Sequence, residues 1–150
     1  MLREMLFNLL YTGFGVLGAI VGFFVLFVVH GNHDIGFWSI LSGILAAVCF
    51  HLDWVKGRGT LDRWHTRVTL RNLHVVGFIS AVAGVTALIW YMFLTCYYNI
   101  PVIPIAGSSA LSAIWAAICG QWGAYLMRHS SRLESLVEEG SARILTENNA

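Results

Sequence analysis

Charged side chains are scarce in this sequence, and long stretches lack them altogether. Only 11 % of its 150 residues are charged, whereas 57 % are hydrophobic. A soluble chain of this length cannot cover four successive helices that are hydrophobic on every face, so the composition excludes an ordinary globular domain. Proline is equally rare. Both prolines, Pro101 and Pro104, fall in one link, where we expect them to end the helix before them.

Several motifs that would point to an enzyme or a metal site are missing. The three cysteines form no C-x-x-C pair and lie in apolar stretches, which argues against a disulfide framework and against a zinc site. No G-x-x-x-x-G-K-[ST] motif occurs, so direct use of ATP is not expected. We predict a protein that is not an enzyme and that binds no nucleic acid.

Four apolar stretches remain, at about residues 9–29, 36–55, 73–96 and 105–127. Each is long enough to cross a hydrocarbon core of about 30 Å as a helix. The sequence therefore predicts an all-α integral membrane protein, with residues 1–150 forming a single transmembrane four-helix bundle in a lipid membrane. Residues 128–150 should be a short cytosolic tail with an amphipathic piece, disordered at residues 147–150.

Basic residues lie on one side of these four spans. Arg3 precedes the first span, and Arg128, Arg132 and Arg143 follow the fourth. The other five of the nine fill the link between the second and third spans: Lys56, Arg58, Arg63, Arg67 and Arg71. Basic residues concentrate in cytoplasmic loops. We therefore expect both termini to be cytosolic.

The first span carries a G-x-x-x-G pair, Gly18 and Gly22. Such pairs allow helices to approach closely, either within one chain or between two copies. The sequence leaves both possibilities open, and we expect a homo-oligomer.

Histidines mark three levels of the predicted bundle. His30 and His33 lie at the outer mouth, and His51 lies about one turn inside the second span from its cytosolic end. The third level, which is cytosolic or at the inner interface, holds His65, His74 and His129. An ionisable residue inside a span usually faces a cavity or a partner. His51 is thus the strongest single candidate, with a structural hydrogen bond to a neighbouring helix as the alternative.

The fourth span presents a stripe of small polar and aromatic residues at helical spacing: Ser112, Trp115, Cys119, Trp122, Leu126 and His129. The stripe predicts either a wide, flat slot or plain packing between helices. With Tyr97 and Tyr98 at the outer mouth, a slot would suit a planar, metal-bearing ligand such as haem b, whose iron accepts His or Tyr. Arg132 would pair a propionate.

The sequence resembles the haem-responsive-gene family of four-span haem importers. The resemblance rests on Leu41–His51, on Ser108–Trp122, and on the shorter run Gly77–Val82. It implies transport of haem from outside, or from an acidic lumen, into the cytosol across the plasma membrane or an endosome–lysosome membrane. It maps the family's second-span histidine onto His51.

Two family features differ in this chain. The family's aromatic-basic-aromatic motif aligns with His129–Leu133, where Arg132 keeps the basic character and both aromatics are absent. Tyr97 and Tyr98 stand in the link where many members have a histidine. The candidate iron ligands are His51 and His129, and the wider haem site adds Tyr97, Tyr98, Trp115, Trp122, Arg132, His30 and His33.

Two other functions fit the same residues. In a membrane redox protein, His51 and His74 would sandwich a fixed haem, which should survive purification and undergo reversible reduction. In a non-catalytic tetraspan scaffold, the Gly and Trp residues would serve packing, and haem would cause no spectral change.

Overall fold

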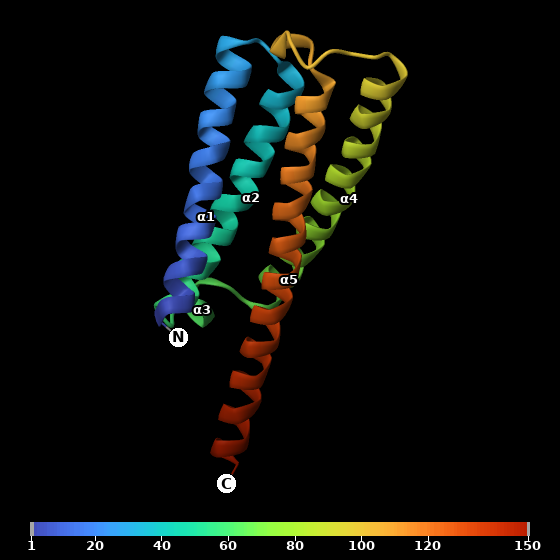
Figure 1. The fold of residues 1–150 in the computed structure, drawn as a ribbon. Coiled ribbons are helices and arrows are strands. Elements are labelled where there is room, and N and C mark those ends of the chain that lie inside the picture. Colours follow the sequence, from blue (N-terminus) through green and yellow to red (C-terminus); the bar gives the residue numbers. More distant parts are fainter. Residues whose placement is uncertain (1, 150) are drawn as a thin grey trace.

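Residues 2–149 are described by a computed structural model, and helix is the only regular secondary structure among them. Four helical segments are long and apolar enough to cross a membrane, as many as the sequence predicts. They are α1 (Leu2–Gly22) with its π-helical continuation Phe23–Val29, α2 (His33–Gly57), α4 (Arg67–Tyr97) and α5 (Ser109–Asn148) (Figure 1). Two short elements complete the chain, α3 (Leu61–Trp64) and the 3-10 turn Ile105–Gly107.

The last helix differs most from its predicted span. We expected a separate amphipathic tail after residue 127, but α5 continues without a break to Asn148. Residues 128–148 contain no proline and are rich in Glu, Arg, Leu and Ala, which favour helix. The predicted disorder is therefore wrong for Glu147 and Asn148; Ala150 lies outside the described residues.

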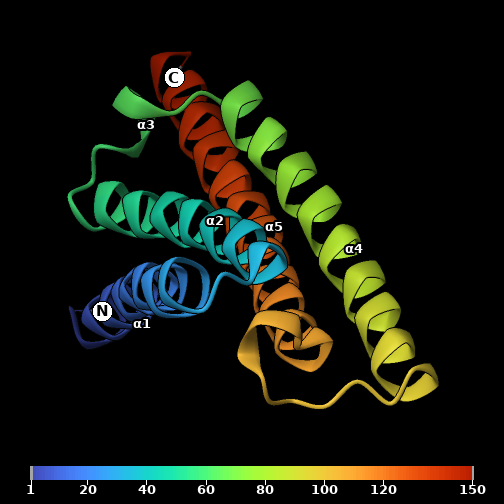
Figure 2. The same ribbon diagram turned by 90° about the horizontal axis from the view of Figure 1, so that it is seen from above.

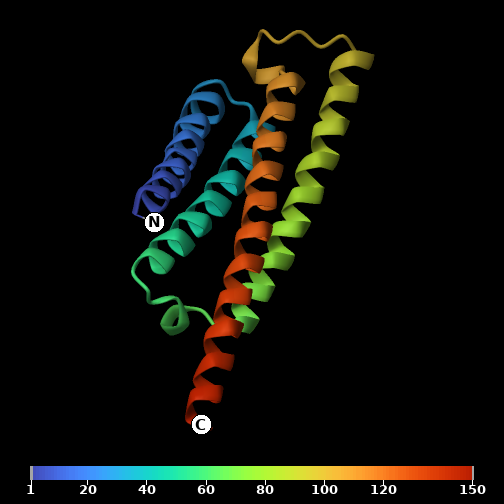
Figure 3. The same cartoon turned by 60° about the horizontal axis from the view of Figure 1, so that its bottom comes forward.

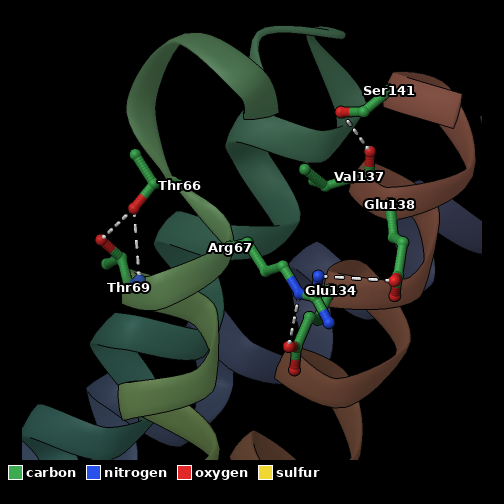
Figure 4. A network of polar contacts seen from close by, with 7 residues as sticks. All are labelled: Thr66, Arg67, Thr69, Glu134, Val137, Glu138 and Ser141. Atoms are coloured by element: carbon green, nitrogen blue, oxygen red, sulfur yellow. Dashed lines mark hydrogen bonds and ion pairs between the residues drawn. The ribbon is translucent and has the colours of Figure 1, made fainter. Parts of the chain in front are cut away.

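Side-chain caps fix where three of the long helices begin. The Asn32 side chain accepts a hydrogen bond from the Ile35 amide, and Ser108 does the same for Leu111. Thr66 caps α4 by accepting from the Thr69 amide at 3.3 Å (Figure 4). Each cap satisfies an amide that the first helical turn leaves without a partner.

The helices form an open row in which the main contacts run α1–α2–α5–α4. Figure 2 shows α1 and α4 on opposite flanks, with α2 and α5 between them. The predicted four-helix bundle is therefore an open one, because a closed bundle would bring α4 against α1. The row leaves the outer faces of α1 and α4 exposed, and these faces carry large apolar side chains, as lipid contact requires.

Glycines explain why α4 packs almost entirely on α5. A Cβ added at Gly84 would lie 2.5 Å from the backbone nitrogen of Gly120, and one at Gly77 would lie 2.7 Å from the carbonyl oxygen of Gly123. The two backbones therefore touch along this seam, which is the packing that small residues permit in membranes. Other large side chains of α4, such as Phe78, Ile89 and Trp90, are more than half exposed.

The two ends of the row differ in charge. The start of α1, the link 58–66 with α3, and the far end of α5 lie together at one end, which we call the basic end (Figures 1 and 3). Here Arg67 of α4 contacts Glu134 and Glu138 of α5, each at 3.4 Å (Figure 4). The links 30–32 and 98–108 form the opposite end, which we call the proline end. The Asn32 amide ties these two links together by donating to the Ile105 carbonyl at 2.9 Å.

Candidate functional site

The two tryptophans of the α5 stripe fill space between α1 and α5. Trp115 lies against Gly22 and Trp122 lies against Gly15, so closely that a Cβ at either glycine would overlap the indole. Trp122 is 5 % exposed and belongs to the core. The prediction that these indoles line an open slot is therefore wrong, and the packing alternative describes them.

Gly18 takes no part in the packing of the indoles against α1, because nothing lies within 4 Å of a Cβ placed there. The G-x-x-x-G pair is thus divided: Gly22 receives an indole of the same chain, whereas Gly18 faces open space.

His129 faces a carboxylate. Its Nε2 lies 2.9 Å from Oδ1 of Asp53 on α2, and the side chains are 9 % and 4 % exposed. The ring N–H is not directed at that oxygen, so the contact is an ion pair when His129 is protonated and not an aligned hydrogen bond. Tyr125 stacks on the imidazole, with ring centroids 5.6 Å apart. His129 is accordingly enclosed by its own chain and is not open to a large planar ligand.

A hollow of about 450 Å³ reaches Asp53 from the basic end. Its other lining residues are Leu2, Glu4, Met5, Asn8, Lys56 and Gly57. The second carboxylate oxygen of Asp53, Oδ2, has no hydrogen-bond partner among the described residues. A buried carboxylate oxygen without a partner is costly, so a ligand in the hollow that donates a hydrogen bond would be stabilising.

Arg132 belongs to a different surface from His129. It lines a shallow hollow of about 450 Å³ between α4 and α5, together with His74, Met127, Arg128, Ser131 and Ser135. The Nδ1 atom of His74 lies 2.9 Å from the Met127 carbonyl oxygen, so this ring already has a hydrogen-bond partner. Two guanidinium groups and two hydroxyls make this hollow suitable for a carboxylate or a phosphate.

His51 has a histidine neighbour that the sequence did not indicate. The centroids of the His51 and His65 rings are 5.4 Å apart, with an angle of 76° between the ring planes. The centroids of the His51 and Trp64 rings are 5.9 Å apart, with an angle of 83°. His51 is on the exposed side of α2, near the basic end, while Trp64 ends α3 and His65 follows it in the short link to α4. The three rings form a cluster that we call the His51–His65 cluster.

Both ring nitrogens of His65 are shielded from solvent and lack a hydrogen-bond partner among the described residues. Burial, and then the neighbouring His51, lower the pKa of His65 below its usual 6.5. A lowered pKa keeps the imidazole neutral at neutral pH, and neutral imidazole is the form that binds metal. The cluster therefore offers two imidazoles, one of which has unused nitrogen atoms.

The predicted outer residues separate into two groups at the proline end. Tyr97 and Tyr98 lie at the end of α4, where Phe93 stacks on Tyr97 with centroids 5.4 Å apart. His30 ends the π-helical segment, and His33, the first residue of α2, lies edge-on to Phe27. The end of α4 and the link between α1 and α2 lie on opposite flanks (Figure 1). The tyrosines and the histidines therefore do not form one mouth.

Sequence reasoning placed His65 in the cytosol or at the inner interface but did not pair it with His51, and it gave Asp53 no role. A signal for His65 was present, because Trp64-His65 follows a short polar link that returns the chain to the end of α2. No local spacing could have paired Asp53 with His129. Among residues 2–149, no group of three or more His, Cys, Asp or Glu side chains is arranged to hold a free metal ion.

Comparisons with protein-family models, with curated proteins and with solved structures find no match to this chain.

Proposed function

We propose that this chain is a membrane transporter that carries haem b into the cytosol, with the His51–His65 cluster as its inner haem site. The proposal rests on the pairing of these two imidazoles at the basic end, together with the resemblance of Leu41–His51 and Ser108–Trp122 to the haem-responsive-gene family. In this proposal the basic end faces the cytosol, as the distribution of Lys and Arg predicts.

The cluster suits haem for three chemical reasons. His51 is exposed at the membrane side of α2, where an amphipathic ring dissolved in the bilayer arrives first. Iron would bind one of the ring nitrogens of His65, which have no hydrogen-bond partner. That bond would offset the free-energy cost of burying a polar atom without a partner. Trp64, 64 % exposed, offers an aromatic face beside the same rings.

Other predicted residues take revised roles. Tyr97 and Tyr98 are exposed at the proline end and serve as the first iron contact on entry. Arg132 and Arg128 line the hollow that would accept a propionate on exit. Trp115, Trp122 and His129 hold the helices together. Several weak sites suit a carrier better than one tight site, because the cargo must leave.

Growth of a haem-auxotrophic cell on low haem tests the function directly. Cells that make the native chain should grow, and His51→Leu or His65→Leu should abolish the advantage at equal membrane abundance. Purified native protein should change its haem Soret band on binding, and both variants should lose that change. Unaltered growth and spectra in both variants would remove the cluster from the proposal; no haem-dependent growth by the native chain would refute transport.

His74→Gln is the matched control. It removes an imidazole at the same end, yet its amide can still donate to the Met127 carbonyl. We expect this variant to keep the change in the haem Soret band, because His74 lies outside the His51–His65 cluster. Loss of a tightly held, reducible haem in this variant would instead support a fixed-haem redox protein that uses His51 and His74.

A further inference from the structure

The outward face of α1 and α2 contains an apolar groove of about 580 Å³. Leu9, Gly13 and Phe14 of α1 line it from one side, and Phe50 and Trp54 of α2 line it from the other. The Phe50 and Trp54 rings are nearly parallel, at 19° with centroids 6.5 Å apart, and they form a flat wall. Gly13 leaves the floor open, because its nearest neighbour is 3.8 Å from an added Cβ.

Two close contacts between α1 and α2 narrow the groove near its ends, and Val16 also lines a second apolar hollow of about 280 Å³ that continues toward the proline end. Toward the proline end, Ala19 and Gly43 bring α1 and α2 together, with 3.1 Å between the Ala19 Cβ and a Cβ added at Gly43. At the basic end, Met5 lies directly against Gly57. From Met5 to Leu17, the lined part of α1 is about 18 Å long at the rise of a helix. This length and the apolar lining suit one acyl chain.

Polar groups stand where the groove meets the basic end. Met5 lines both the groove and the hollow that reaches Asp53, so the two spaces adjoin. That hollow is lined by Lys56, Glu4 and Asp53. The Oδ2 oxygen of Asp53 is buried and has no partner among the described residues. Arg58 adds a second cation, 4.7 Å above the Trp54 ring. Positive and negative groups thus lie side by side.

We propose that the groove and the hollow together bind one phospholipid whose headgroup ends in a primary ammonium, as in phosphatidylethanolamine. One acyl chain lies in the groove between α1 and α2. The phosphate meets Lys56 and Arg58, and the ammonium donates hydrogen bonds to the carboxylates of Asp53 and Glu4. This inference requires that the chain spans a membrane, and it does not depend on haem transport.

Charge alone does not define this ligand. Phosphatidylcholine has the same charges as phosphatidylethanolamine, but its quaternary nitrogen has no N–H and cannot donate a hydrogen bond to Asp53 or Glu4. Stepwise N-methylation should therefore weaken binding stepwise, whereas a purely electrostatic site would treat the series alike. The loss of a hydrogen bond to a charged acceptor should lower affinity about tenfold.

Tryptophan fluorescence in vesicles provides the test. The full chain is placed in phosphatidylcholine vesicles that contain a rising fraction of lipid brominated on its acyl chains. The Trp54 signal is the difference between the native chain and Trp54→Phe, which keeps an aromatic ring in the wall. We expect brominated phosphatidylethanolamine to quench Trp54 at about a tenth of the fraction that brominated phosphatidylcholine requires. Equal quenching by the two lipids overturns the proposal.

Two glycines of the same helix supply the paired variants. Gly13→Leu should fill the groove and remove the preference for phosphatidylethanolamine. Gly18→Leu makes the same change where nothing lies within 4 Å, and it should keep the preference. If both variants keep the preference for phosphatidylethanolamine, or both lose it, the groove is not the binding site. A Trp54 signal that no brominated lipid quenches, together with dimers in crosslinking, would assign the groove to a second copy of the chain instead.

Discussion

Asp53 and His129 face each other across the interface of α2 and α5, with 2.9 Å between Oδ1 and Nε2. Both side chains are nearly fully buried, and each is one helical turn or less from the basic end of the apolar part of its helix. A carboxylate or an imidazole buried at this depth is destabilising when it has no polar partner, and here each group is the partner of the other. The pair therefore joins the two central helices of the row.

A double-mutant cycle measures this dependence. Asp53→Leu or His129→Leu alone should lower the free energy of unfolding by about 3 kcal/mol, because each leaves one polar partner buried alone. The double substitution should be less destabilising than the sum of the two, since it leaves neither. Unfolding in detergent micelles, followed by circular dichroism, gives the three values. Strictly additive effects would show that the two side chains do not interact.

The contact between Gly15 and Trp122 predicts a second effect on stability. Gly15→Leu places a side chain where the indole now lies, and it should cost about 1–3 kcal/mol by forcing α1 away from α5. Gly18→Leu has open space and should leave the midpoint of thermal unfolding nearly unchanged. Equal midpoints for the two variants would contradict the packing of Trp122 into α1.

The lowered pKa of His65 makes stability depend on pH in a defined direction. The unfolded chain takes up a proton near the usual pKa of 6.5, while the folded chain takes it up only at lower pH. The contribution is therefore complete above about pH 6.5, is lost as the pH falls through that value, and levels off below the folded pKa. The thermal midpoint should fall between about pH 7.5 and about pH 5.5.

His65→Gln should show a smaller fall over the same interval, because the titrating group is gone. The difference is expected to be modest, since the ring is partly exposed. A variant that loses as much stability as the native chain would assign the pH dependence to other groups.

Orientation in the membrane can be tested with single cysteines in a chain whose native cysteines are replaced. Asp62 lies in the link at the basic end, and Val102 lies in the link at the proline end; both are exposed. In intact cells, a membrane-impermeant thiol reagent should label Val102→Cys and should label Asp62→Cys only after permeabilisation. The reverse pattern would place the basic end outside.

The sequence by itself determined the number of long apolar helices and the common end of their basic flanks. Both follow from local physics: an apolar run of sufficient length satisfies its backbone only as a helix in lipid, and caps such as Asn32 and Ser108 act within one turn. The continuation of α5 was missed because a change from apolar to polar residues marks a change of solvent and not the end of a helix.

Tertiary structure alone decided which residues meet. The stripe on α5 reads equally well as a slot or as packing, and only the placement of Gly15 and Gly22 opposite Trp122 and Trp115 distinguishes them. His65 reaches His51 because the link 58–66 folds back on α2, and His129 reaches Asp53 because α2 and α5 are neighbours in the row. Such pairings depend on helix order and rotation, which are set by contacts between residues distant in sequence, and no periodicity within one helix encodes them.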